Sequence, residues 1–386
     1  MVEENGLISG YVAPGFEPVA EEFERNFTSR GEVGAAFSAV CDGELVVDLW
    51  GGLAAPDKPW QEDTLQVVFS GTKGLLAACM LLLQERGLIE LDRPVAWYWP
   101  EFAAQGKERV LVRHVVSHRS GLPGIASPLL IEDYADDREM QRLLAAQPLA
   151  GDPNAFGCYH PLTIGWLCGG LIRRIDGRSL GRFFAEEFAL PLGLDIWIGL
   201  PEREDNRVGR LELGPGFGAW DQGLSDAQRN DRLRRSIWGN PPLFMPDLAW
   251  NTRRFHHAQI GGAGAVASAR AMARFYACLA NGGTLDGKRV LAPETIEAGL
   301  VQQSYFIDPF LLDPRAFGTV FALQTKHLRL GPDPAAFGHP GAGGSLHAAW
   351  PSSRTGFSYV MNQMRSGPED DRSSLLLKAL DAAIAC

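Results

Sequence analysis

The sequence lacks any run of basic residues. Its 36 Lys and Arg are outnumbered by 46 Asp and Glu, and the formal net charge of −10 is spread along the chain. A dispersed acidic charge creates no surface that would attract a phosphate backbone or anionic lipid headgroups. We therefore expect neither nucleic acid nor a membrane surface as a partner, and a small neutral or moderately polar substrate fits better.

Signals for export and membrane insertion are missing as well. The stretch Met1–Gly10 has no basic segment followed by a long apolar core, and the apolar run Leu75–Leu83 is too short to span a bilayer. The six cysteines show no C-x-x-C spacing, which is typical of reduced thiols; they are Cys41, Cys79, Cys158, Cys168, Cys278 and Cys386. These absences predict a cytoplasmic protein, and its oligomeric state is left open.

What is present is a chain long enough for two lobes. It has 386 residues, 46% of them hydrophobic, which exceeds the usual size of one domain. Phe16, Ala20, Phe23 and Phe27 recur at helical spacing before Gly31. Strands are expected at 35–40 and 44–50, joined by a turn at Asp42-Gly43, and at 320–323, 345–350 and 356–361. Loops are expected at 305–314 and 331–334. A closing helix is expected at about 373–385.

Because strands gather at both ends of the chain, the pattern predicts an α+β fold. Residues 1–69 and 286–386 would form a discontinuous α/β domain, an antiparallel sheet flanked by helices. Residues 70–285 would form a mainly helical domain, with the active site in the cleft between the two. Ser70 lies at their junction, where clefts usually form.

Ser70 and Lys73 are the most informative residues. The apolar run that follows them, with Gly87 as a plausible stop, predicts a helix that begins at Ser70, so both side chains point to one face. A desolvated lysine amine can take the proton of a serine hydroxyl without any histidine. The alternative is a capping serine followed by a surface lysine. However, none of the other five lysines has serine three residues before it, and the helix dipole disfavours a cation in the first turn.

Such a pair needs a proton donor for the leaving group and a second oxyanion donor. Tyr159, in a loop before the apolar helix 164–175, is the best donor, because a phenol both donates and accepts; a core aromatic with a satisfied hydroxyl is the alternative. The glycine-rich segment 337–345, just before a strand, lets the backbone approach a substrate closely. Its simpler interpretation is a turn.

In this order and at these long intervals, Ser70-x-x-Lys73, Tyr159 and His339-x-Gly341 resemble the three motifs of serine β-lactamases and penicillin-binding proteins. The chain is more specifically similar to the class C β-lactamase-like carboxylesterases, the family VIII esterases. The resemblance extends over nearly the whole chain; it includes 11–16, 67–70, 112–122, 159–173 and 337–345.

The resemblance implies a β-lactamase/penicillin-binding-protein-like fold and a serine carboxylesterase that hydrolyses short-chain acyl esters, with no cofactor or metal. Ser70 would be acylated, while Lys73 and Tyr159 share proton transfer. The oxyanion would be held by the N–H groups of Ser70 and Ala342, beside His339 and Gly341.

Two departures bear on the substrate. Where the β-lactamase motif has Tyr-x-Asn this chain has Pro161, and where it has Lys-Thr-Gly this chain has His339, which is mostly neutral near pH 7. Both changes weaken binding of penicillin-like anions and favour a neutral ester, leaving weak β-lactam hydrolysis open. The alternatives are an acyltransferase of the same fold, a β-lactamase or DD-peptidase, or a non-catalytic binding homologue.

Other chemistries fit less well. An α/β-hydrolase would need G-x-S-x-G, which is missing. Zinc held by Cys158, His160 and the pair at 256–257 matches no familiar spacing. His114 and His118 could share one helical face and are expected to be structural. The segment 261–264 leads toward a helix and could bind a dinucleotide, but a tight turn near the cleft is preferred.

Overall fold

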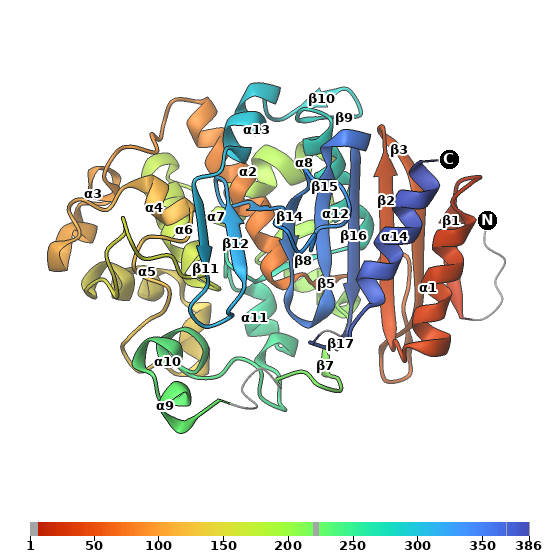
Figure 1. Ribbon diagram of the computed structural model, residues 1–386, viewed down its shortest axis with the longest axis horizontal. Coiled ribbons are helices and arrows are strands. Elements are labelled where there is room, and N and C mark those ends of the chain that lie inside the picture. The colour runs from red at the N-terminus through yellow and green to blue at the C-terminus, as the bar shows by residue number, and fades with distance from the viewer. Residues whose placement is uncertain (1–6, 219–223, 368, 386) are drawn as a thin grey trace.

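One large antiparallel sheet organises the molecule (Figure 1). The computed structural model describes residues 7–218, 224–367 and 369–385. Residues 1–6, which belong to the stretch without an export-signal pattern, and Cys386 lie outside these ranges. In order across the sheet, the strands are β1 (Ile8–Val12), β3 (Glu44–Ala55), β2 (Gly34–Cys41), β16 (Thr355–Met361), β15 (Leu346–Trp350), β14 (Phe337–Pro340), β13 (Ala322–Leu323), β12 (Pro314–Phe317) and β11 (Ser304–Ile307), with β4 (Lys58–Pro59) beside β3.

Both ends of the chain therefore build the sheet, as the sequence predicts. Strands β2 and β3 form the expected hairpin, in which Asp42 and Gly43 have φ of 51° and 86°. Two positive φ values in succession are those of a type I′ turn, which matches the twist of the flanking strands. Strands β15 and β16 lie where the sequence predicts them, and α14 (Arg372–Ile384) is the closing helix.

Helices cover both faces of this sheet. Gly356 of β16 lies against the backbone of Ala277 in α12 (Ala269–Ala280), so close that a Cβ would collide. Tyr359 points to the opposite face, because side chains alternate along a strand, and its hydroxyl donates to Glu32, which follows α1 (Glu17–Ser29). On that face α1 packs against α14 (Figure 1).

The middle of the chain forms a helical lobe beside the β11–β14 end of the sheet (Figure 1). Its helices are α2 (Thr72–Glu85), α3 (Val95–Tyr98), α4 (Val112–Val116), α5 (Asp137–Ala146), α6 (Thr163–Asp176), α7 (Leu180–Phe184), α8 (Leu190–Leu192), α9 (Asp226–Arg229), α10 (Arg232–Trp238), α11 (Arg253–His257) and α13 (Pro293–Leu300). Smaller sheets pair β5 (Gln66–Val67), β8 (Ala265–Ala267) and β6 (Ile196–Ile198); β9 (Thr284–Leu285) and β10 (Lys288–Arg289); and β7 (Glu212–Leu213) and β17 (Gln363–Met364).

Helix α2 is the centre of the lobe. Residues 72–83 are all buried, as expected for a helix that is apolar on every side. The division of the chain into 1–69 with 286–386 and 70–285 stays a prediction. Helix α12 falls in the second segment, yet it packs on β16, β2 and β15 of the sheet.

Two sequence expectations are wrong in detail. The segment 305–314 is not a loop throughout, because β11 continues to Ile307 and β12 begins at Pro314. Strand β11 is a short edge strand on which Tyr305 and Ile307 are exposed. It therefore lacks the buried apolar pattern and the length by which a strand is usually predicted from sequence. At 320–323 only Ala322–Leu323 is a strand, because Val320 turns the chain with a φ of 66°.

Among the described residues, none of the helices has both the length and the apolarity needed to cross a bilayer.

Candidate active site

Ser70 lies on a 3-10 turn, η1 (Phe69–Gly71), immediately before α2. The turn is fastened to β8: the Val68 N–H donates to Ala265 O at 3.0 Å, and Thr72 Oγ1 accepts from the Ala265 N–H at 2.9 Å. Thr72 Oγ1 also donates to Phe69 O at 2.6 Å. Phe69 has a φ of 45°, which costs free energy for a residue with a side chain and persists only where the surroundings enforce it. The serine is thus held in one position.

Lys73 is fully buried, with an exposed fraction of 0%. Its Nζ lies 3.0 Å from Ser70 Oγ and 2.7 Å from each of two carbonyl oxygens, those of Pro161 and Gly262. Burial lowers the pKa of Lys73 well below its usual value, and the positive charge of Arg315 lowers it further. The surface lysine considered as an alternative is therefore excluded.

Tyr159 completes a triangle with these two side chains. Its hydroxyl lies 2.9 Å from Ser70 Oγ, and its ring is 4.9 Å from Lys73 Nζ. The residue sits in the loop before α6, as the sequence predicts, where its backbone N–H donates to Asp308 Oδ2 at 2.7 Å. Burial raises the pKa of the Tyr159 hydroxyl, so the phenol stays protonated across the ordinary pH range.

His339 on β14 lies behind Tyr159. The two rings stack at 5.8 Å, and His339 Nε2 is 3.4 Å from the Tyr159 hydroxyl. Burial lowers the pKa of His339 well below its usual value, so the ring is neutral. Because its Nδ1–H donates to Pro340 O at 2.8 Å, Nε2 carries the lone pair that faces the phenol.

Gly341 and Ala342 lie beside η1. The segment 337–345 is not a simple turn: its first four residues are strand β14, and η8 (Ala342–Gly344) follows. A Cβ on Gly341 would lie 2.6 Å from Val68 O and collide with Ser345 Oγ. A glycine is therefore required, because the strand approaches the backbone just before Ser70.

We predict that Gly341→Ala lowers turnover at least about tenfold, because β14 must move away from η1 and misplace the Ala342 N–H. Steady-state kinetics with a p-nitrophenyl ester would measure this loss. Gly169→Ala is a suitable control, because Gly169 lies on α6 away from both cavities and a Cβ there would meet only the Leu180 Cβ, at 3.8 Å, which is an ordinary van der Waals contact. Equal activity in the Gly341→Ala variant and the wild type would contradict the role of this close approach.

Two neighbouring cavities open beside Gly341. One, of about 420 Å³, touches Gly341 and Ala342 and has aromatic walls from Phe217, Trp238, Phe244 and Phe310. The other, of about 830 Å³, shares Arg329, Gly341 and Asp370 with the first and extends toward Lys378. Such volumes suit small-molecule ligands, and the aromatic walls suit an apolar group.

Several groups in the site were not predicted from the sequence. The carbonyls of Pro161 and Gly262 carry no residue-type signal, since every residue has a carbonyl. Arg315, whose guanidinium lies 5.6 Å from the centre of the Tyr159 ring, comes directly after the segment 305–314 that was interpreted as a loop. The tight turn expected at 261–264 is confirmed near the site, although it leads into strand β8 before α12 begins.

The histidine expectations need correction. His114 lies on α4, but His118 lies beyond its end with a φ of 61°, so the two do not share a helical face. His118 Nδ1 instead accepts the His160 N–H at 2.9 Å, and its ring lies 5.0 Å from that of Tyr159. Within the part of the chain that the structure describes, no group of three or more His, Cys, Asp or Glu could hold a metal ion.

Known proteins are similar to this chain in sequence and in architecture. The family model described as "Beta-lactamase" matches residues 19–381. The esterase/beta-lactamase LipL of Mycobacterium tuberculosis is 35% identical over 93% of this chain and 84% of its own. The crystal structure of a family VIII carboxylesterase superposes with a TM-score of 0.90 and 36% identity, covering 97% of this chain and 99% of its own. Monacolin J acid methylbutanoyltransferase of Aspergillus terreus is 28% identical over 40% of this chain and 43% of its own.

Proposed function

The chain belongs to the beta-lactamase family, and we propose that it is a serine carboxylesterase that works through an acyl-enzyme on Ser70. One observation carries this proposal: Ser70 Oγ lies within hydrogen-bond distance of both the buried Lys73 amine and the Tyr159 hydroxyl. The likeness to a family VIII carboxylesterase and to LipL supports ester hydrolysis as the reaction.

Lys73 is the general base of this mechanism. A neutral amine has two N–H groups and one lone pair; the carbonyls of Pro161 and Gly262 take the two N–H groups. The lone pair is then left for the Ser70 hydroxyl proton. As that proton moves to Nζ, Ser70 Oγ attacks the ester carbonyl carbon and a tetrahedral oxyanion forms.

Tyr159 passes the proton to the leaving group. The oxyanion collapses, the ester C–O bond breaks, and the departing oxygen takes the Tyr159 proton while the Lys73 ammonium returns one to the phenol. The raised pKa of Tyr159 supports a relay through a protonated phenol rather than a standing phenolate. Water then attacks the acyl-enzyme by the same steps in reverse, releasing a carboxylic acid and free Ser70.

The oxyanion is held by the backbone N–H groups of Ser70 and Ala342. N–H groups in the first turn of a helix have no partner within that helix, and Ser70 lies in the first turn of η1. Gly341 packs against Val68 O, and this close approach brings the N–H of the next residue, Ala342, toward the N–H of Ser70. Two such donors stabilise the charge that develops in the transition state.

The substrate is a small ester without a carboxylate beside the scissile bond, with a short acyl chain. Neutral His339 and Pro161 offer no fixed charge to an anion, and the aromatic walls of the cavity beside Ala342 accept an apolar group. The charged residues in the lining of this cavity are Arg234, Arg329, Arg365 and Asp370. A series of p-nitrophenyl esters of rising chain length, with a cephalosporin alongside, tests this. Efficient turnover of the cephalosporin and none of the esters would make the protein a β-lactamase.

An acyltransferase is the second candidate, because a methylbutanoyltransferase is among the relatives. The two differ in what attacks the acyl-enzyme, an alcohol or water. Adding an alcohol during butyrate-ester hydrolysis and analysing the products separates them. An esterase releases mainly butyric acid, whereas a transferase releases mainly the new ester. A chain with all three reacting side chains in contact argues against a non-catalytic homologue.

Ester hydrolysis is expected to fall toward acid pH, because a protonated Lys73 cannot accept the Ser70 proton. Burial lowers the pKa of Lys73 well below its usual value, so the acid limb of the pH profile should lie below the pH at which an exposed lysine titrates. We expect kcat/KM in His339→Asn to drop about tenfold or less, with its acid limb at the same pH as in the wild type. If the acid limb of the pH profile moved or disappeared in His339→Asn, the group that titrates would be His339 and not Lys73.

The cytoplasmic location stays a prediction. The five cysteines within the described residues are free thiols, which supports a reducing compartment.

A further inference from the structure

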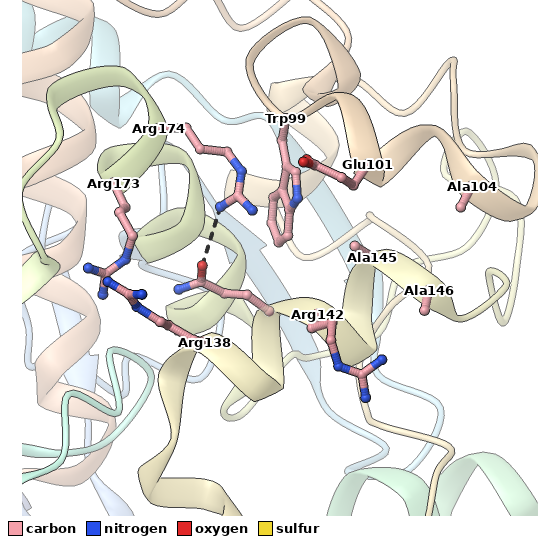
Figure 2. A pocket seen from close by; sticks show the side chains of 10 residues that line it. Trp99, Glu101, Ala104, Arg138, Arg142, Ala145, Ala146, Arg173 and Arg174 are labelled. Carbon is pink, nitrogen blue, oxygen red and sulfur yellow. Dashed lines mark hydrogen bonds between the residues drawn. The ribbon is translucent and has the colours of Figure 1, made fainter.

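A separate hollow lies on the helical lobe, between α5, α6 and the segment 99–104 (Figure 2). Its volume is about 660 Å³, and none of its lining residues lines the two cavities beside Gly341. The walls are the side chains of Trp99, Glu101, Ala104, Arg138, Gln141, Arg142, Ala145, Ala146, Arg173 and Arg174. Four of these are arginines and one is acidic, in a chain whose net charge is −10.

Local ion pairs account for only two of the four guanidinium groups. Arg173 pairs with Asp137, and Arg142 pairs with Glu139. For Arg138 and Arg174 the described residues provide no carboxylate within ion-pair distance. Arg173 Nε is also buried without a hydrogen-bond partner. Arg138, Arg173 and Arg174 therefore each have guanidinium N–H groups that are available to a ligand.

Helix stability does not explain Arg138. It lies in the first turn of α5, at the positive end of the helix dipole, where a cation is unfavourable. Figure 2 shows Arg138 and Arg173 on the same side of the hollow; Asp137 already pairs with Arg173, whereas no carboxylate among the described residues pairs with Arg138. An anion beside Arg138 would offset the unfavourable position of its charge.

The other half of the hollow is rigidly built. The Arg174 guanidinium stacks over Trp99 at 4.0 Å, and its Nη1 donates to Gln141 Oε1 at 3.3 Å and to Gly170 O at 3.1 Å. Trp99 and Gln141 are buried, with exposed fractions of 1% and 4%. The guanidinium is therefore held in place before any ligand arrives, which lowers the entropic cost of binding.

We propose that this hollow binds a small organic phosphate. Guanidinium groups match the geometry of phosphate oxygens and bind them with charge-assisted hydrogen bonds. A volume of about 660 Å³ exceeds that of inorganic phosphate, and Ala104, Ala145, Ala146 and Trp99 add an apolar wall for the organic part. The phosphate contacts Arg138 and Arg173, and the organic part extends toward Arg174 and Trp99.

Isothermal titration of the full-length protein with phenyl phosphate tests the proposal, with inorganic phosphate and benzoate as the two comparison ligands. We expect saturable binding of phenyl phosphate that weakens with added salt, weaker binding of inorganic phosphate and the weakest of benzoate. No saturable heat up to millimolar phenyl phosphate would overturn the proposal. Benzoate binding as tightly as phenyl phosphate would overturn the assignment to phosphate.

Arg138→Gln is the test variant, because the side chain is exposed and its loss leaves the fold intact. Binding of phenyl phosphate should weaken about tenfold or more in this variant. Arg182→Gln is the matched control; Arg182 is also an exposed arginine near the start of a helix, and it pairs with Glu186. Ester hydrolysis should be unchanged in both. Equal phosphate binding in Arg138→Gln and the wild type would overturn the site.

Discussion

Replacing Ser70 by alanine is expected to abolish ester hydrolysis while the fold stays intact. The change removes a single oxygen atom, the one that lies 3.0 Å from Lys73 Nζ and 2.9 Å from the Tyr159 hydroxyl. Without it no covalent acyl-enzyme forms, and the remaining oxyanion donors have no nucleophile to assist. Steady-state hydrolysis of p-nitrophenyl butyrate measures the loss, and circular dichroism checks the fold.

A serine-reactive phosphonate gives a second, direct readout. Mass spectrometry of the inactivated wild type should place the adduct on Ser70, and Ser70→Ala should take up none. Ser29→Ala serves as the control, because Ser29 is an exposed residue at the end of α1 and its loss should leave both activity and labelling unchanged. An adduct on another serine, together with an active Ser70→Ala variant, would remove the basis of the proposed mechanism.

Losing either proton-transfer group should be nearly as damaging. Lys73→Ala and Tyr159→Phe are each expected to lower turnover by about two orders of magnitude or more, the usual effect of removing a general acid or base. Tyr159→Phe keeps the ring that stacks on His339 and deletes only the hydroxyl. Lys288→Ala is a control for the loss of a lysine, because Lys288 is exposed on β10 and lines neither of the cavities beside Gly341.

The double variant distinguishes a cooperating pair from two independent residues. Because both groups contact the same Ser70 oxygen and pass the same proton, the double variant should be scarcely slower than the slower single variant. Losses that multiply would show that the two residues act separately. Near-normal activity in Tyr159→Phe would mean that another group protonates the leaving alcohol.

The sequence by itself determined the elements whose signal is local. The spacing of Ser70 and Lys73 predicted side chains on one side, and Asp42-Gly43 predicted the hairpin. The glycine-rich segment 337–345 was expected to approach a substrate closely, and the close approach that the structure shows is that of Gly341 to the Val68 carbonyl. Helix periodicity and turn chemistry act over a few residues, so they can be seen without the fold. The resemblance of the motifs then predicted the protein family and identified Tyr159 as a site residue.

Only the tertiary structure decided how these residues are charged and what they touch. Burial and the charge of Arg315 lower the pKa of Lys73. The carbonyls of Pro161 and Gly262 that contact its Nζ come from segments about 90 and 190 positions away. Edge strand β11 and the place of α12 on the sheet were likewise invisible, since pairing partners far apart in sequence define them. Burial and long-range contact are properties of the assembled chain, so no local pattern reveals them.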